Sequence, residues 1–263
     1  AIVVQGDRVT RKINCGGPAY NDYAADWPAS ARTAKYRQRY LPSEDFYLDW
    51  ATAEFGSQAA QPAAKLLAQL DGHLPQPATW VGGPGGINPD STPGEQVARQ
   101  YEFVEQFAQL HPLVASAGPG HLERFEYWLA NFRYLRALGK MRCTWAQYNE
   151  AIKKVKAEKD PDAQKKLARQ LALPLRKQLV AEVAELHNYL MQTVSTWGEL
   201  GTVANWQQHN LPGLLIAPGD ELSKLLGEPL PADAMPPRYY QGPPRLIVPT
   251  VRGLLESGEP LRL

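Results

Sequence analysis

A cluster of aromatic and polar residues near position 200 is the part of the sequence best suited to chemistry. It holds Trp197 and Trp206 together with Glu199, Asn205 and His209. Sugar-binding sites combine flat aromatic faces, which stack on the C–H surfaces of a sugar ring, with planar carboxylate and amide groups that bind hydroxyls. The sequence therefore predicts that these five side chains cluster on a concave, carbohydrate-binding surface. The alternative is a helix-terminating loop whose tryptophans seal a helical bundle.

Glu199 is the best single candidate for a catalytic acid. Glycoside hydrolysis needs two carboxylates about 5–5.5 Å or 6.5–9.5 Å apart, and the sequence does not place any two acids across a cleft. Glu123 and Glu126 lie on a predicted helix, where ion pairing with residues three or four positions away is their expected role. Glu199 instead lies in a segment that we expect to be non-helical, so the catalytic pair stays unassigned apart from this candidate.

A loop expected over residues 72–94 supplies a further stacking candidate, Trp80. The loop also contains Gly82-Gly83-Pro84-Gly85-Gly86. This run lacks the Lys-Ser/Thr pair of a phosphate-binding loop, so we interpret its glycines as a need for unusual backbone angles. A long loop of this kind is usually functional or disordered, and a central tryptophan favours order.

The sequence predicts no metal and no cofactor. The five histidines are scattered, and none is spaced to share a metal on one helix face. Two cysteines are too few for a disulfide scaffold or a four-cysteine zinc site, so Cys15 and Cys143 are expected to be buried thiols. The Gly-x-Ser-x-Gly motif, the Walker phosphate-binding loop and the His-Glu-x-x-His motif are also missing.

Charge and hydropathy exclude two classes of partner. Lysine and arginine number 28 against 27 acidic residues, a net charge of +1, which argues against nucleic-acid binding. No apolar run reaches about 18 residues, so no membrane span is expected. The first seven residues do not form a signal peptide.

The periodicity of the chain predicts a mainly α fold. Apolar residues recur at helical spacing over residues 43–56, 57–70, 95–110, 122–156, 161–196 and 219–226, and a kink is expected at Pro174. Residues 1–14, 245–251 and 260–263 have the pattern of strands. We expect an irregular bundle of five or six helices over residues 43–228, flanked by residues 1–42 and 229–263, with a small β element formed by the chain ends. Because both ends stop within strands, a segment of a longer protein is expected, with a complete small protein as the alternative.

Two stretches resemble known families. Residues 11–20, Arg-Lys-Ile-Asn-Cys-Gly-Gly-Pro-Ala-Tyr, with Asp22 and Ala25-Asp26-Trp27, resemble the opening of malectin-type carbohydrate-binding modules. Those modules are complete β-sandwiches, whereas helices begin here near Ser43, so the resemblance implies no ligand residue. Residues 46–56, Phe-Tyr-Leu-Asp-Trp-Ala-Thr-Ala-Glu-Phe-Gly, with Ala59-Ala60 and Leu66-Leu67, are similar to helices that follow the catalytic barrel in large bacterial glycoside hydrolases of the α-glucuronidase and agarase types.

Together the resemblances imply a helical region of a polysaccharide-degrading glycoside hydrolase, with the catalytic barrel outside this chain. The implied partners are a polysaccharide or oligosaccharide and the rest of the parent enzyme, in a secreted or periplasmic location. The binding residues expected are Trp80, Trp197, Asn205, Trp206 and His209. Two alternatives stay open, namely a free-standing carbohydrate-binding module and a non-catalytic scaffold or interaction domain.

Overall fold

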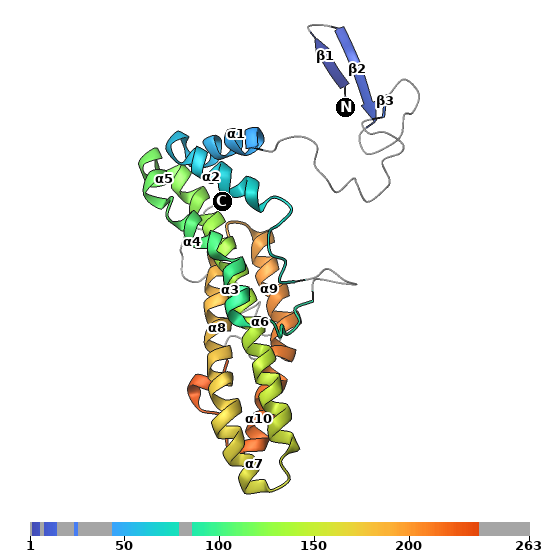
Figure 1. Cartoon of the computed structure of the whole chain (residues 1–263), viewed down its shortest axis with the longest axis vertical. Coiled ribbons are helices and arrows are strands. Elements are labelled where there is room, and N and C mark those ends of the chain that lie inside the picture. The colour runs from blue at the N-terminus through green and yellow to red at the C-terminus, as the bar shows by residue number, and fades with distance from the viewer. Residues whose placement is uncertain (1, 6–7, 15–23, 26–43, 79–85, 237–263) are drawn as a thin grey trace. The chain divides into compact units, whose positions relative to one another are not determined.

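The structure is a computed structural model that describes residues 2–5, 8–14, 24–25, 44–78 and 86–236 (Figure 1). The chain divides into two compact units, Ala1–Asp45 and Phe46–Leu263. The first unit holds a three-stranded sheet of order β1-β2-β3, with β1 at Ile2–Gln5, β2 at Arg8–Asn14 and β3 at Ala24–Ala25. β1 and β2 pair antiparallel and β2 pairs parallel to β3. The expected pairing with the C-terminal strands falls on residues 237–263, outside the described residues.

The second unit is mainly α, as predicted. Its α-helices are α1 (Glu44–Phe55), α2 (Ser57–Leu70), α3 (Gly94–Gln100), α4 (Glu102–Ala108), α5 (His111–Ala117), α6 (Pro119–Ala157), α7 (Pro161–Leu167), α8 (Leu173–Gln192), α9 (Trp197–Leu211) and α10 (Ala217–Leu226). Two π-helical segments, η3 (Ala168–Ala172) and η4 (Pro212–Ile216), and a 3₁₀ turn, η5 (Ala232–Ala234), complete the described part of the chain.

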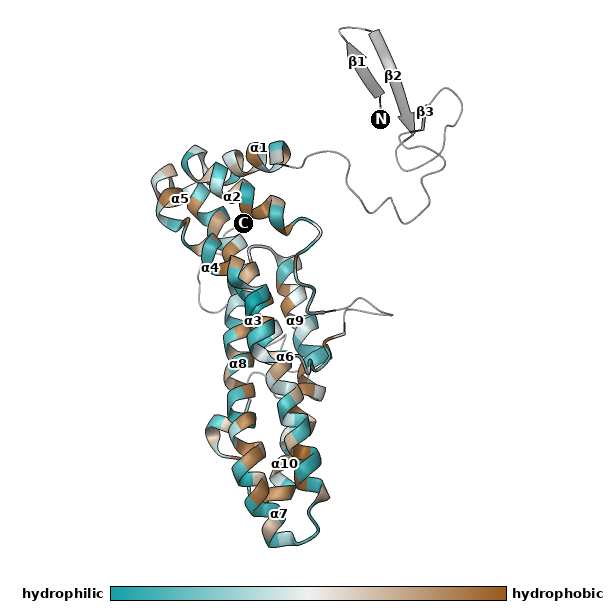
Figure 2. Cartoon of the chain, in the orientation of Figure 1, coloured by the Kyte–Doolittle hydropathy of each residue, from teal (hydrophilic) through white to brown (hydrophobic). Residues whose placement is uncertain are grey.

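The 39-residue helix α6 is the element around which the unit is built. It packs along α8, and the ribbons of both alternate between hydrophilic and hydrophobic residues, as expected for helices that bury one side (Figure 2). Buried residues of α6 belong to three hydrophobic clusters: one with α1–α5, one with α8, α9 and η4, and one with η3 and α10. Each section of α6 therefore has its own packing partners.

Aromatic rings fill the first of these clusters. Phe55, Phe107 and Phe125 are fully buried, and the rings of Phe107 and Phe125 stack with centroids 4.6 Å apart. Phe55 meets both rings edge-on at 5.6 and 5.7 Å. Offset and edge-to-face pairs of this kind stabilise a core by more than their buried area alone. These three phenylalanines, from α1, α4 and α6, thus serve as core.

Both π segments end two residues before a proline. η3 precedes Pro174 and η4 precedes Pro218, and each is closed by a bond from residue i+5, Leu173 N to Ala168 O and Ala217 N to Pro212 O. A proline has no N–H, and its ring clashes with the carbonyl four residues earlier in a regular α-helix. Widening the preceding turn relieves that clash without ending the helix. The kink expected at Pro174 therefore takes the form of a π turn.

Two helix predictions were wrong. The helix predicted over residues 95–110 is divided at Tyr101 into α3 and α4, and a separate helix, α5, follows. Residues 197–211, predicted to be non-helical, form α9. Thr196 and Glu199 make a reciprocal capping box at its start, and Val203, Trp206 and Leu211 are buried along it. Capping and burial together outweigh the low helix propensity of Gly198 and Gly201.

Candidate functional site

Glu199 caps a helix in the structure. Its Oε2 accepts hydrogen bonds from the backbone and side chain of Ser195, each at 2.7 Å, and from those of Thr196 at 2.8 and 3.1 Å. The Tyr127 hydroxyl donates to Oε1 at 3.3 Å. The hydrogen bonds from Ser195 and Thr196 lower the pKa of Glu199 to about 2. A carboxyl group with so low a pKa stays ionised and is a poor proton donor, which does not suit the catalytic-acid role predicted for Glu199.

The structure does not gather the other sequence-predicted residues on one face of α9. Trp206 is buried with the side chains of α6 and α8, whereas Trp197 is 51% exposed. Nine residues separate them, and at about 100° per residue they lie on opposite sides of the helix. Asn205 and His209 are exposed. Trp80 falls in residues 79–85, outside the described residues.

The structure describes one of the two cysteines and one buried histidine. Cys143 is a free thiol that is 4% exposed, as expected, and burial raises its pKa. Cys15 lies outside the described residues. His187 is buried against Gln207, and burial lowers its pKa to about 4, which keeps the ring neutral at pH 7. No cluster of three potential metal ligands occurs among the residues that the structure describes.

A stripe of polar side chains along α6 forms a site that the sequence analysis did not identify. The stripe advances by alternating steps of three and four residues, which keeps its members on one face of a helix. Its residues are Arg133, Arg136, Lys140, Cys143, Gln147, Glu150 and Lys154. All of them line one or both of two pockets between α6 and α8.

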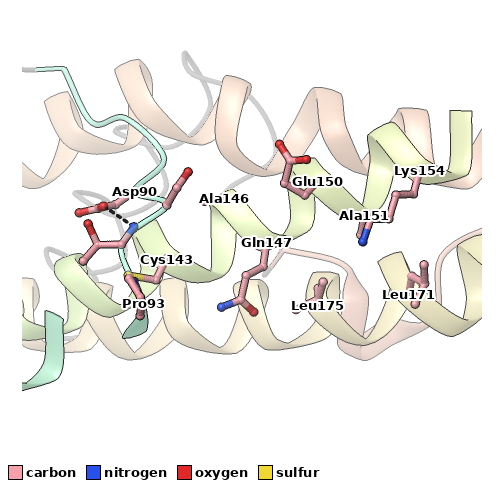
Figure 3. A pocket seen from close by; sticks show the side chains of 12 residues that line it. Asp90, Pro93, Cys143, Ala146, Gln147, Glu150, Ala151, Lys154, Leu171 and Leu175 are labelled. Carbon is pink, nitrogen blue, oxygen red and sulfur yellow. Dashed lines mark hydrogen bonds between the residues drawn. The ribbon is translucent and has the colours of Figure 1, made fainter. Parts of the chain in front are cut away.

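The first pocket, which we call the Asp90 pocket, has a volume of about 390 Å³ (Figure 3). Asp90 and Pro93 form its wall at one end, and Lys154 lies toward the other end. Gln147 and Glu150 project from α6 between them, and Leu171 and Leu175 come from η3 and α8.

Arg142 fixes the loop that carries Asp90. Its Nε donates to Asn88 O at 2.6 Å, its Nη1 lies 3.7 Å from Asp90 Oδ2, and its backbone carbonyl accepts from Asp90 N at 3.1 Å. The Thr92 backbone N–H donates to Asp90 Oδ1 at 3.0 Å. Hydrogen bonds from Thr92, together with the charge of Arg142, lower the pKa of Asp90. Asp90 is therefore a positioned, ionised hydrogen-bond acceptor at the edge of the pocket.

The second pocket, which we call the Tyr189 pocket, has a volume of about 520 Å³ and lies among α3, α6 and α8. Tyr101 and Tyr189 supply its aromatic surface, and Tyr189 also donates to the Glu185 carboxylate at 3.3 Å. Its remaining polar groups are Glu95, Arg133, Arg136, Lys140, Thr144, Gln147 and Gln178. Hydrogen-bond acceptors and donors therefore lie next to the half-buried ring of Tyr189.

A partly buried hydrogen-bond network connects three residues of the Tyr189 pocket lining. Gln178 Nε2 lies 3.2 Å from Thr144 Oγ1 and donates to Glu182 Oε1 at 2.9 Å. Lys140 Nζ lies 3.6 Å from the same carboxylate oxygen. Glu182 is only 4% exposed, so its charge holds the Lys140 ammonium at the edge of the pocket. Gln178, Thr144 and Lys140 therefore already have partners in the pocket without a ligand.

The two pockets adjoin, because Cys143 and Gln147 line both. We call the combined feature the α6 groove. From Arg133 to Lys154 it follows α6 for about 30 Å, at 1.5 Å per residue. Its lining has four cationic side chains and four anionic ones; they are Arg133, Arg136, Lys140 and Lys154, and Asp90, Glu95, Glu150 and Glu185. The groove is therefore long, polar and close to electrically neutral.

The signal for this groove was present in the sequence, but it was ambiguous. A polar stripe on a long helix usually marks a solvated face, and only the packing of residues 90–98 and of α8 beside it makes a groove.

Among the described residues, no helix has the length and apolar character needed to cross a membrane. No protein family, curated protein or solved structure matches the chain.

Proposed function

We propose that this chain binds a chain-like, neutral carbohydrate in the α6 groove. The observation that carries the proposal is the row of two adjoining pockets, which offers hydrogen-bonding groups of both kinds over about 30 Å of α6. A linear oligosaccharide presents hydroxyls along its whole length, and each hydroxyl both donates and accepts. The apolar faces of its rings would meet Tyr189 in one pocket and Leu171 and Leu175 in the other.

The charge balance of the groove favours a neutral ligand over a polyanion. Nucleic acids and sulfated polymers bind surfaces with an excess of lysine and arginine. Here the cationic side chains are matched in number by carboxylates. Two of the cations already have partners, because Arg136 pairs with Glu105 and Lys140 pairs with Glu182. A polyanion would meet as much repulsion as attraction along this lining.

Binding, and not hydrolysis, is the activity that we assign to the chain itself. A glycosidase needs one carboxylic acid that is protonated at working pH, and its pKa is raised accordingly. Asp90 has a lowered pKa, which suits an acceptor and not a proton donor. The chain would then act as the helical region of a polysaccharide-degrading enzyme, as the resemblance of residues 46–56 implies, and the bond-cleaving carboxylates would lie elsewhere in that enzyme.

Gln147 gives the sharpest test, because it is exposed and lines both pockets. We would titrate the chain by calorimetry with hexasaccharides of β-1,4-glucose, β-1,4-xylose and agarose type, and with a hexagalacturonate as the acidic probe. Gln147→Ala should weaken binding of the preferred neutral probe about five- to tenfold, which corresponds to the ~1 kcal/mol of one hydrogen bond. Gln192→Ala, at the end of α8 and outside the groove, is the matched control and should leave the affinity unchanged.

Trp197→Ala separates the groove from the surface first predicted on α9. Unchanged binding in this variant supports the α6 groove, and lost binding would return the site to α9. The proposal is overturned if no neutral hexasaccharide binds, or if hexagalacturonate binds more tightly than all of them. Release of shorter sugars from any probe would show that the chain carries its own catalytic carboxylates.

A further inference from the structure

Arg176, on α8, is a buried cation without a counter-ion among the described residues. The residue has no exposed surface. Its Nε donates to the Ala234 carbonyl at 3.0 Å, but neither terminal nitrogen, Nη1 or Nη2, has a hydrogen-bond partner. Burial lowers the pKa of Arg176, yet a guanidinium stays protonated in proteins. A buried, uncompensated charge is strongly unfavourable, and such groups are normally paired.

The groups that pack around the guanidinium do not neutralise it. Tyr148, on α6, interacts electrostatically with the guanidinium, but burial raises its pKa to about 12, so its hydroxyl is neutral and donates to Pro218 O at 3.0 Å. Asp220, on α10, is exposed and close enough to interact electrostatically, but it forms no ion pair with Arg176. The arginine therefore keeps two unused, forked donor groups, the arrangement that matches a carboxylate.

A pocket of about 600 Å³ lies against Arg176. We call it the Arg176 pocket. Apart from Arg176, Asp220 and Ser223, its lining is apolar or glycine and includes Leu215, Ile216, Gly219, Leu230 and Met235. Its volume is within the range of sites for small organic ligands, which typically have an apolar lining and few polar groups. A single cation in an otherwise apolar pocket selects a ligand with one anionic end and an apolar body.

We propose that the Arg176 pocket binds an amphipathic monocarboxylate, with the carboxylate on the Arg176 guanidinium and the apolar chain along Leu215, Ile216 and Met235. Gly219 allows the guanidinium to lie against α10, because a Cβ at this position would lie 2.8 Å from Nη2 and 3.5 Å from Leu230 Cδ1. Asp220 at the pocket lining sets an upper limit on affinity, since its charge repels the same carboxylate that Arg176 attracts. The pocket shares no lining residue with the α6 groove, so this proposal does not depend on the proposed function.

Octanoate and octan-1-ol are the probes, because they share an apolar chain and differ in charge. Calorimetry on the full chain should show octanoate binding with at least tenfold higher affinity than octan-1-ol, and no binding of acetate at the same concentrations. Arg176→Met replaces the cation with an apolar side chain of similar length and should reduce the preference for octanoate to less than twofold. Arg169→Met is the matched control, since it removes an exposed arginine that pairs with Glu228 outside the pocket.

Two further variants keep the test decisive if Arg176→Met folds poorly, which circular dichroism would show. Gly219→Ala should weaken octanoate at least fivefold by filling the space beside the guanidinium, and Asp220→Asn should strengthen it about two- to fivefold by removing a repelling charge. Equal affinity for octanoate and octan-1-ol would overturn the proposal, as would the absence of octanoate binding at millimolar concentration. Unchanged octanoate affinity in Gly219→Ala together with Asp220→Asn would place any bound octanoate elsewhere and would overturn it too.

Discussion

Replacing Glu199 with alanine should destabilise the helical unit without touching a ligand site. The substitution removes the acceptor of four hydrogen bonds from Ser195 and Thr196, and one from Tyr127. These donors are exposed or half-buried, so water replaces part of the lost hydrogen bonding. The expected cost is therefore that of a helix N-cap, about 1–2 kcal/mol.

The assay is urea unfolding at pH 7, followed by circular dichroism. Glu199→Ala should lower the urea midpoint without changing the slope, and the thermal midpoint should fall by roughly 2–4 °C per kcal/mol for a unit of this size. Glu150→Ala is the control, because Glu150 is an exposed mid-helix residue paired with Lys153, and its loss should cost at most about 0.5 kcal/mol. If both variants unfolded at the same urea concentration as the parent, the capping role would be refuted.

The pH dependence gives this prediction a second readout. The pKa of Glu199 is about 2 in the folded chain and 4.5 as its ordinary value, so its ionised form stabilises the fold above pH 4.5. That contribution is lost as the pH falls from 4.5 toward 2. Glu199→Gln keeps a capping side chain but cannot ionise, so the stability gap between the parent and Glu199→Gln should narrow from pH 7 to pH 3. A gap that stays constant over this range would contradict the lowered pKa.

Three further predictions follow from packing. Phe107→Ala should cost about 3–5 kcal/mol in urea unfolding, because the ring is fully buried and stacks on Phe125; a loss below 1 kcal/mol would contradict the described core. Gly56→Ala should cost at least about 1 kcal/mol, since Gly56 has φ +82° and a Cβ there would lie 2.5 Å from Ala117 Cβ. Cys143 should react with iodoacetamide far more slowly in the folded chain than in the chain unfolded by about 6 M guanidinium chloride. Equal reaction rates would contradict the burial of the Cys143 thiol and its raised pKa.

Sequence reasoning identified helices best where a local signal and an apolar stripe coincide. The stripe through Phe125, Leu129 and Phe132 predicted the long helix, and all three side chains are buried in α6. Asp160 followed by Pro161 predicted the start of the next helix, where Asp160 Oδ1 accepts from the Ala163 N–H at 2.7 Å. Both signals operate within one or two turns, so they do not require knowledge of the tertiary fold.

The same reasoning failed at α9 because two local signals disagreed. Gly198 and Gly201 argue against a helix, whereas Thr196 followed three residues later by Glu199 is the sequence of a capping box. The helical periodicity of apolar residues fails after Gly198, so residues 199–212 were predicted to be a polar, aromatic and non-helical segment, with Glu199 as a site residue. Burial of Trp206 against α6 and α8 decides the outcome, and burial depends on elements distant in the sequence.

The α6 groove could not be predicted for a related reason. The spacing of its stripe fixes which α6 residues share a face, but a polar face on a helix is ordinarily covered by water alone. Asp90, Gln178 and Tyr189 turn that face into a groove, and they come from a loop and a helix that are separated from the stripe in sequence. The loop is held by Arg142, whose contacts to Asn88 and Asp90 only exist in the folded chain.

The two π turns connect the irregular parts of the helices to the Arg176 pocket. Pro174, after η3, lies two residues before Arg176, and Pro218, after η4, lies directly before Gly219. Each π turn carries one more residue than an α turn, so the residues that follow are rotated relative to those before it. The two rotations together bring the guanidinium of Arg176 against the one position of α10 that has no side chain to block it. The prolines that disturb the helices thereby leave the buried Arg176 guanidinium facing a pocket. Without the π turns, the Arg176 side chain would point in another direction.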